Sequence, residues 1–305
     1  MPHNSPNSAP VLEVSEAEAG QKLLQFLARR LGLSQNMLHR WIRTGQVRRN
    51  AMRAKAFDRV LAGELVRVPP FALRMAATVP SAALAPPLPE LVASLPDLLV
   101  FNKPSGLPVQ PGSGHTDSLS SRLAVHFAEA SFRPTPAHRL DKDSSGLVLV
   151  ATSYERLRAL HEAFAGRRVG KEYLAWVEAV WPHSSSCLLE DFVAKGGAPG
   201  HERMRAGQGR QALCAVQRLY ADGDKSLVHI QLVTGRTHQI RLQLAERGHP
   251  LCGDLKYGAR PCATGFFLHA FRLNLPEGTF VCEPPWTGEW QLPAAVSLPA
   301  LAYRI

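Results

Sequence analysis

The stretch PAHRLDKDSSGLVLVA, residues 136–151, places charged side chains directly before an apolar run. Gly146 permits a tight turn, and residues 147–151 are typical of a short buried strand. The charged group is therefore expected on a loop that enters a rigid strand, which suits a functional group. For this loop alone, a structural Asp–Arg pair at the surface is the favoured interpretation. The ionisable residues are His138, Arg139, Asp141, Lys142 and Asp143.

The segment after this strand predicts a helix. Thr152 and Glu155 have the spacing of a capping box, in which Thr152 would be the N-cap. Leu157, Leu160 and Phe164 share one helical face. The charged loop therefore belongs to a strand–helix unit.

Residues 227–235, LVHIQLVTG, predict a strand that leads into another helix, with Thr237 as its expected N-cap. Arg236, His238 and Arg241 fall near the start of this helix. Helix N-termini attract anions, and guanidinium groups strengthen that attraction. This segment therefore predicts a site for a carboxylate or a phosphate.

Residues 171–180, KEYLAWVEAV, predict a strand that carries Tyr173, and for this residue alone a core aromatic is the favoured interpretation. An aspartate nucleophile must stay ionised in a site that excludes water. Burial raises the pKa of a carboxylate, and a nearby arginine lowers it again. Asp141 paired with an arginine such as Arg241 would supply such a nucleophile. An aromatic ring would hold a planar base that has been flipped from its stack.

The block HRLDKDSSGLVLVA closely resembles the signature of RluA-type pseudouridine synthases. Four further blocks match the family in the same order, so the resemblance covers residues 90–275 and is specific. It implies an α+β fold, with a mixed and largely antiparallel central sheet and flanking helices and loops around a catalytic cleft. The other blocks are NKPSGLPVQPG, KEYLAWVEA, LVTGRTHQIRLQLAERGHPLCGDLKYG and FLHAFRL.

The resemblance also implies roles for individual residues. Asp141 matches the catalytic aspartate, which attacks either C6 of the target uracil or C1′ of its ribose. Tyr173 matches the tyrosine that stacks on the target base, and Arg241 matches the arginine that pairs with the aspartate. Arg139 matches an arginine associated with flipping of the target nucleotide or with filling the space that it vacates. The resemblance implies no cofactor and no metal. Supporting roles in substrate binding are expected for His138, Arg236 and His238.

The N-terminal segment is strongly basic. Residues 13–70 hold eleven Lys and Arg against five Asp and Glu, in a chain whose net charge is +10. The segment resembles the small αL RNA-binding domain named for ribosomal protein S-four, although Ala51 stands where a turn glycine is usual. One-signed clustered charge favours phosphate contacts over a merely solvated helix face. The residues expected to bind RNA here are Arg40, Arg43, Arg48 and Arg49.

Composition divides the 305 residues into four parts. Residues 1–12 are expected to be a disordered tail, 13–70 the S-four-like domain, 71–89 an Ala/Pro-rich linker and 90–305 the catalytic domain. No apolar run is long enough for a membrane span, and no secretion signal is recognised, so a cytoplasmic protein without membrane contact is expected. The five cysteines lack metal-ligand spacing. A monomer is the default expectation.

Three functions remain open from the sequence. The favoured one is an RNA pseudouridine synthase, with large-subunit ribosomal RNA preferred over tRNA as its partner. The second is a catalytically inactive RNA-binding paralogue, against which the intact set Asp141, Tyr173 and Arg241 argues. The third is an acid–base hydrolase that uses Asp141 and His138, but no oxyanion site or metal cluster is recognisable.

Overall fold

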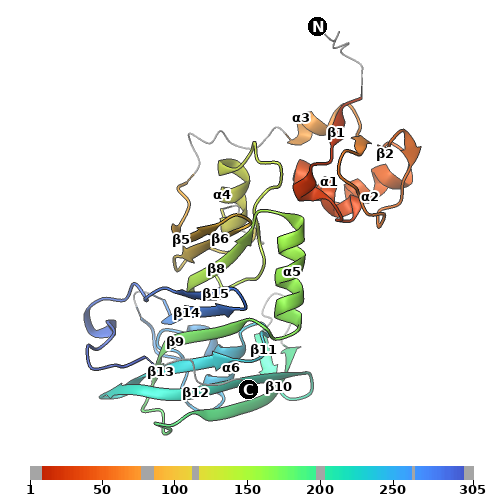
Figure 1. The fold of residues 1–305 in the computed structure, drawn as a ribbon. Coiled ribbons are helices and arrows are strands. Elements are labelled where there is room, and N and C mark those ends of the chain that lie inside the picture. The colour runs from red at the N-terminus through yellow and green to blue at the C-terminus, as the bar shows by residue number, and fades with distance from the viewer. Residues whose placement is uncertain (1–8, 77–85, 112–116, 197–202, 263–264, 299–305) are drawn as a thin grey trace.

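The computed structural model describes residues 9–76, 86–111, 117–196, 203–262 and 265–298. These residues form a small N-terminal unit and a larger unit around one long sheet (Figure 1). The expected α+β class is confirmed, with a mixed and largely antiparallel central sheet. Within the described ranges, no helix is long and apolar enough to cross a membrane.

The small unit packs helices on a four-stranded sheet of order β1-β4-β2-β3. Leu27, Leu38 and Trp41 on the helices and Val66 on the sheet belong to one buried cluster, so this unit has its own core. Its elements are β1 (Val11–Glu13), η1 (Glu16–Glu18), α1 (Leu23–Leu31), α2 (Gln35–Arg43), β2 (Arg48–Arg49), β3 (Met52–Arg53), β4 (Leu65–Arg67) and α3 (Ala72–Ala76).

Both ends of the small unit extend further than the sequence predicted. The expected tail, residues 1–12, lies outside the described residues up to position 8, but Val11 and Leu12 form strand β1 and pair with β4. Leu12 packs against the core, which is why the strand begins this early. Helix α3 occupies the start of the expected linker, because Ala72 is buried in the same core. Residues 77–85 of that linker lie outside the described residues.

The turn between β2 and β3 is strained. Asn50 and Ala51 have φ angles of 45° and 65°, the left-handed conformation that an Asn-Gly turn adopts readily. A side chain in this conformation costs about 1 kcal/mol relative to glycine. The alanine noted in the sequence therefore keeps the usual turn geometry at some cost in stability.

The large unit is built on an eleven-stranded sheet whose main path runs β11-β10-β12-β13-β9-β14-β8-β6-β5. All strand pairs are antiparallel except β14 with β8. Its elements are β5 (Glu90–Leu95), β6 (Leu98–Lys103), α4 (Leu119–His126), β7 (Thr135–Pro136), β8 (Ser145–Ala151), α5 (Tyr154–Ala165), β9 (Gly170–Glu178), β10 (Cys187–Gly196), β11 (Arg203–Ala206), β12 (Arg210–Asp222), β13 (Lys225–Leu232), α6 (Gln239–Ala245), η3 (Leu255–Tyr257), β14 (Leu268–Leu275), β15 (Gly278–Val281) and η4 (Gly288–Trp290).

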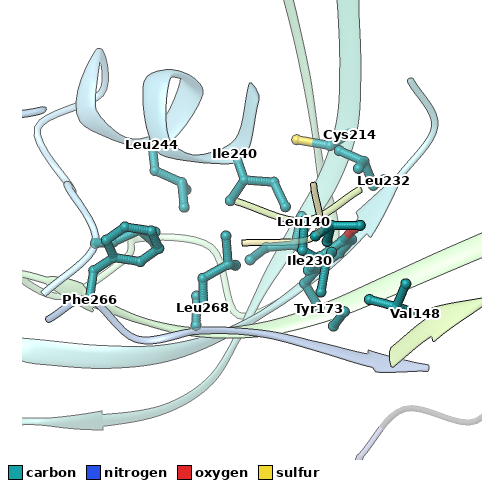
Figure 2. Close-up of a cluster of buried hydrophobic side chains, with 14 of the residues drawn as sticks. Leu140, Val148, Tyr173, Cys214, Ile230, Leu232, Ile240, Leu244, Phe266 and Leu268 are labelled. Atoms are coloured by element: carbon teal, nitrogen blue, oxygen red, sulfur yellow. The ribbon is translucent and has the colours of Figure 1, made fainter. Parts of the chain in front are cut away.

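Strand β8 is buried on both faces, as its apolar run predicted. Val148 and Val150 join the cluster on the side of α6, whereas Leu147 and Leu149 join the cluster on the side of α5. Figure 2 shows Val148 near Tyr173 in the first cluster, with side chains of α6 extending toward the sheet. The loop before β8 is therefore anchored to a strand that packs between two core clusters.

Gly146 allows the parallel contact between β8 and β14. Its φ is +109°, and a Cβ atom at this position would lie 2.4 Å from the carbonyl oxygen of Ala270. Any other residue would push the two strands apart. The helix after β8 is capped one residue later than predicted: Ser153, not Thr152, accepts a hydrogen bond from the amide of Arg156 at 3.1 Å. Both side chains are good caps, so local preference alone does not decide between them.

The small unit contacts the large unit near the start of α5 (Figure 1). Arg133 donates a hydrogen bond to the carbonyl oxygen of Arg29 at 2.8 Å. The Arg29 guanidinium in turn lies over the rings of Phe132 and Tyr154, at 5.6 and 5.8 Å from their centres. Burial lowers the pKa of Arg29 from its ordinary value, which is consistent with a packed contact.

Candidate active site

A cleft of about 530 Å³ lies between the loop before β8, strand β9, and α6 with the loop that precedes it. Asp141, Tyr173 and Arg241 all line this cleft, although they come from three separate elements. Its size is in the usual range of about 300–1,000 Å³ for ligand sites. Among the described residues, no cluster of His, Cys, Asp or Glu could hold a metal ion.

Asp141 is held by the backbone of its own loop. Leu140, the residue before it, is buried in the core cluster of Figure 2. The amide of Ser144 donates to the carbonyl oxygen of Asp141 at 3.2 Å, which closes a tight turn. The Asp141 side chain is 19% exposed, so its carboxylate faces the cleft from a fixed main chain.

Lys103 supports the loop that carries Asp141. Its fully buried ammonium donates to the carbonyl oxygen of Lys142 at 3.0 Å and to two carbonyl oxygens of its own loop at 2.8 Å. Burial lowers the pKa of Lys103 to about 8, against the opposing effect of the Asp143 and Asp141 charges. Its ammonium binds three main-chain oxygens, so Lys103 has a structural role in holding the loop.

Arg241 connects Asp141 to a second carboxylate. Its Nη1 donates to Asp141 at 3.1 Å, while Nε and Nη2 donate to the two oxygens of Asp254 at 2.7 and 2.8 Å. The rings of Phe266 and Tyr257 lie 4.4 and 5.0 Å from the guanidinium carbon. Burial alone would lower the pKa of Arg241, but hydrogen bonds and charge from Asp254 and Asp141 outweigh it and raise the pKa. Arg241 is therefore a permanently charged and oriented partner for Asp141.

Tyr173 lies on β9 beside this pair. The residue is 7% exposed and belongs to the core cluster, yet it also lines the cleft. Burial raises the pKa of its hydroxyl far above the ordinary value, and the charge of Asp141 raises it further. The hydroxyl is therefore protonated at neutral pH. Tyr173 is thus both a core aromatic and an aromatic of the cleft lining, so the two interpretations of this residue are compatible.

His238 is the N-cap residue of α6, so the predicted cap at Thr237 is wrong. The helix starts at Gln239, whose side-chain oxygen accepts from the amide of Arg236, and His238 itself is left-handed with φ of 52°. Its Nε2 lies 3.9 Å from an Asp141 oxygen, and its Nδ1 lies 2.9 Å from the Tyr257 hydroxyl. Burial lowers the pKa of His238 despite the charge of Asp141, so the neutral ring is favoured.

The other predicted residues of the large unit also line the cleft, in different environments. His138 accepts a hydrogen bond from the amide of Leu149 at 3.0 Å, and burial lowers its pKa to about 3. This bond fixes the ring to β8. Arg139 is exposed. The Nε of Arg236 donates to the carbonyl oxygen of Gln211 at 3.0 Å, which anchors Arg236 beside the cleft.

The arginines predicted on the small unit are not part of this cleft. Arg40 and Arg43 are exposed in the last turn of α2. Arg48 and Arg49 are half-buried on β2, and each donates to a main-chain oxygen of the same unit, at 3.3 and 2.8 Å. Arg49 also lies 3.5 Å from Glu64. Arg40 and Arg43 therefore remain the more available pair for a ligand.

Asp254 and Lys171 were not predicted as site residues from the sequence. Asp254 is 1% exposed and holds Arg241. Its position within the matching block LCGDLKYG was the only signal, because nothing local shows which partner an isolated acid will meet. Lys171 lines the cleft two residues before Tyr173 on β9. Strand alternation places the two side chains on one face, and this periodicity could have identified it.

Comparison with known proteins agrees with this geometry. A family model described as RNA pseudouridylate synthase matches residues 97–246, which include Asp141, Tyr173 and Arg241. Ribosomal large subunit pseudouridine synthase C of Escherichia coli strain K12 is 35% identical over 92% of this chain and 91% of its own length. The protein of the same name from Pasteurella multocida is 32% identical over 92% of this chain and 87% of its own length. The chain therefore belongs to the RluA-type RNA pseudouridine synthases, and it is an isomerase that acts on RNA.

Solved structures share the same fold. Human RNA Pseudouridylate Synthase Domain Containing 1 superposes with a TM-score of 0.56 at 27% identity, covering 70% of this chain and 91% of its own. Human RNA Pseudouridylate Synthase Domain Containing 4 superposes with a TM-score of 0.54 at 23% identity, covering 64% and 88%. The second match bears on the fold alone.

Proposed function

We propose that this enzyme converts specific uridines of large-subunit ribosomal RNA to pseudouridine, with Asp141 as the nucleophile. The observation that carries the proposal is the Asp141–Arg241 hydrogen bond of 3.1 Å inside a cleft lined by Tyr173. The relatives named ribosomal large subunit pseudouridine synthase C support the choice of RNA. Their similarity extends over nearly the whole chain, including most of the small unit.

In this mechanism the Asp141 carboxylate adds to C6 of the uracil or to C1′ of the ribose. Either route breaks the N1–C1′ bond, allows the base to rotate, and joins C5 to C1′. The proton on C5 leaves, N1 gains a proton, and the aspartate is released unchanged. Reactant and product have the same composition, so the reaction consumes no oxidant, reductant or water. Arg241 holds and orients the nucleophile, and Tyr173 stacks on the base while it rotates.

The small unit is proposed to be the S-four-like domain and to hold the RNA outside the cleft. Exposed Arg40 and Arg43 on α2 provide contacts to backbone phosphates. Arg139, at the exposed rim of the cleft, is placed to occupy the space that the flipped nucleotide leaves. His138, Arg236 and His238 shape the cleft around the nucleotide.

The test is to incubate the purified full chain with protein-free transcripts of large-subunit ribosomal RNA and, separately, with a pool of tRNA transcripts. Pseudouridine is then mapped at nucleotide resolution. We expect conversion of one or a few uridines in the ribosomal transcript. Conversion confined to tRNA would overturn the ribosomal assignment, and no conversion in any RNA would favour an inactive RNA-binding paralogue.

A further inference from the structure

The ammonium of Lys171 has no counter-ion among the residues that the structure describes. It lines the active-site cleft on β9, and within the described residues it makes no hydrogen bond and no ion pair. The strongest charges acting on it are those of Arg167 and Arg236, both positive, and burial together with these charges lowers its pKa to about 8. A poorly solvated, unpaired cation destabilises a folded protein unless a ligand compensates it.

Arg167 and Arg236 also line the cleft, and both are close enough for their charges to act on the Lys171 ammonium. Arg167 follows α5 and has a φ of 55°, a strained conformation for an arginine, and its guanidinium has no hydrogen bond or ion pair to a described residue. Arg236 comes from the loop before α6. Its Nε is anchored on Gln211, and its Nη nitrogens make no hydrogen bond in the described part of the chain.

Lys171 and Arg236 meet at the loop that leads into α6. A Cβ atom on Gly235 would lie 3.3 Å from the Lys171 ammonium, so the lysine reaches the main chain next to Arg236. Asp141, the acidic residue among those that line the cleft, is already held by Arg241. Three cations from separate elements therefore lie near one another in the cleft, and none of them has an acidic partner among the described residues.

We propose that Lys171, Arg167 and Arg236 form a phosphate subsite, which binds a phosphodiester of the RNA strand adjoining the target uridine. Lys171 and Tyr173 project from the same face of β9, about 7 Å apart along the strand. A nucleotide whose base stacks on Tyr173 thus has its backbone within reach of the subsite. The phosphate contact fixes the register of the strand, and Tyr173 and Asp141 act on the base and sugar. This inference rests on the proposed function, because it assumes an RNA substrate.

The first test measures binding of transcribed large-subunit ribosomal RNA across a range of NaCl concentrations. We expect Lys171→Met to weaken binding about tenfold at moderate salt and to reduce the slope of log affinity against log salt by about 0.7 to 0.9, the value for one lost phosphate contact. Lys171→Arg should restore most of both. Arg158→Gln is the charge control, because this exposed arginine of α5 lies near Glu162 and does not line the cleft. An unchanged slope in Lys171→Met would overturn the subsite.

Thermal melting provides an independent readout. Removal of the unpaired ammonium should leave the melting temperature of Lys171→Met at or above that of the wild type, so weak RNA binding cannot be attributed to unfolding. A marked fall in melting temperature would indicate a structural lysine and contradict the proposal. Arg167→Gln, at an exposed position, repeats the binding test without a buried substitution.

The second test removes the phosphate charge. Once the modified uridine is mapped, short RNAs containing it are made with a single methylphosphonate on its 5′ or 3′ side. The wild type should lose about tenfold in affinity for one of them, and Lys171→Met should lose no more than about twofold. Independent, additive losses would overturn the subsite while leaving the proposed function intact. Absence of pseudouridine formation by the wild type would instead overturn the proposed function.

Discussion

The guanidinium of Arg241 lies 3.1 Å from the carboxylate of Asp141, although 100 residues separate them in the chain. The opposite edge of the same guanidinium is bound by both oxygens of Asp254. Arg241 thus has its orientation set by one carboxylate while it pairs with the other. The consequence is a nucleophile whose partner is fixed before any RNA arrives.

Asp254→Asn tests this orientation. The amide keeps the shape of the side chain but removes the charge and one of two acceptor oxygens, so Arg241 should hold Asp141 less firmly. We expect the rate at saturating RNA to fall about 10- to 100-fold, with a half-saturating RNA concentration within about threefold of the wild type. Asp191→Asn is the matched control, because Asp191 pairs with Arg247 at 2.9 Å and does not line the cleft. Equal loss of activity in both variants would show that the effect is structural.

Tyr173→Phe separates the hydroxyl of this residue from its ring. Burial raises the pKa of this hydroxyl and the charge of Asp141 raises it further, so bonding of Asp141 to the nucleoside removes the smaller of the two effects before the hydroxyl takes part in proton transfer. We expect the rate at saturating RNA to fall at least about 100-fold with little change in affinity. Tyr173→Leu, which also removes the ring, should weaken RNA binding. Full activity of Tyr173→Phe would leave only the stacking role.

The sequence predicted the catalytic residues of the candidate active site better than the residues around them. Asp141, Tyr173 and Arg241 lie in blocks whose residue order is recognisable, and strand β8 follows from its apolar run. Asp254 could not be assigned, because its partner depends on how the loop before β14 folds back onto α6. Strand periodicity could have placed Lys171 beside Tyr173, but not its cationic neighbours, which come from loops that only the fold brings together.

Local signals also failed where two residues competed. Thr152 and Ser153 are adjacent caps of similar quality, and the helix uses the second. At α6 the predicted cap Thr237 is displaced by a left-handed His238, a conformation that is uncommon for any residue other than glycine. That strained residue faces Asp141, so the failure coincides with the candidate active site.

His138 makes the stability of the enzyme depend on pH. Its pKa is about 3 in the folded protein, lowered by burial and by the charge of Lys171, against 6.5 when the chain is unfolded. Below pH 6.5 the unfolded chain binds a proton that the folded protein excludes, so stability is lost as pH falls from 6.5 toward 3. Between pH 7 and 5 this histidine should account for about 2 kcal/mol of the loss. Urea unfolding of the wild type and His138→Gln at both pH values checks this, and an equal loss in both would contradict it.

Exposed Arg40 and Arg43 are expected to bind RNA phosphates outside the cleft. The double variant Arg40→Gln/Arg43→Gln should weaken RNA binding. The slope of log affinity against log salt should fall by up to the value for about two phosphate contacts. The rate at saturating RNA should stay within about twofold, because neither side chain lines the cleft. Binding over a range of NaCl concentrations, with Arg158→Gln as the control, measures this. Unchanged affinity would remove the RNA-binding role from α2.

The most direct test of the account is pseudouridine formation by Asp141→Asn on the RNA that the wild type modifies. Asparagine keeps the size of the side chain and an oxygen for Arg241, but it cannot act as a carboxylate nucleophile. We expect no detectable product and an RNA affinity within about threefold of the wild type, while Asp143→Asn, two residues away on the same loop, remains active. Product formation by Asp141→Asn at a rate within tenfold of the wild type would contradict the nucleophile assignment.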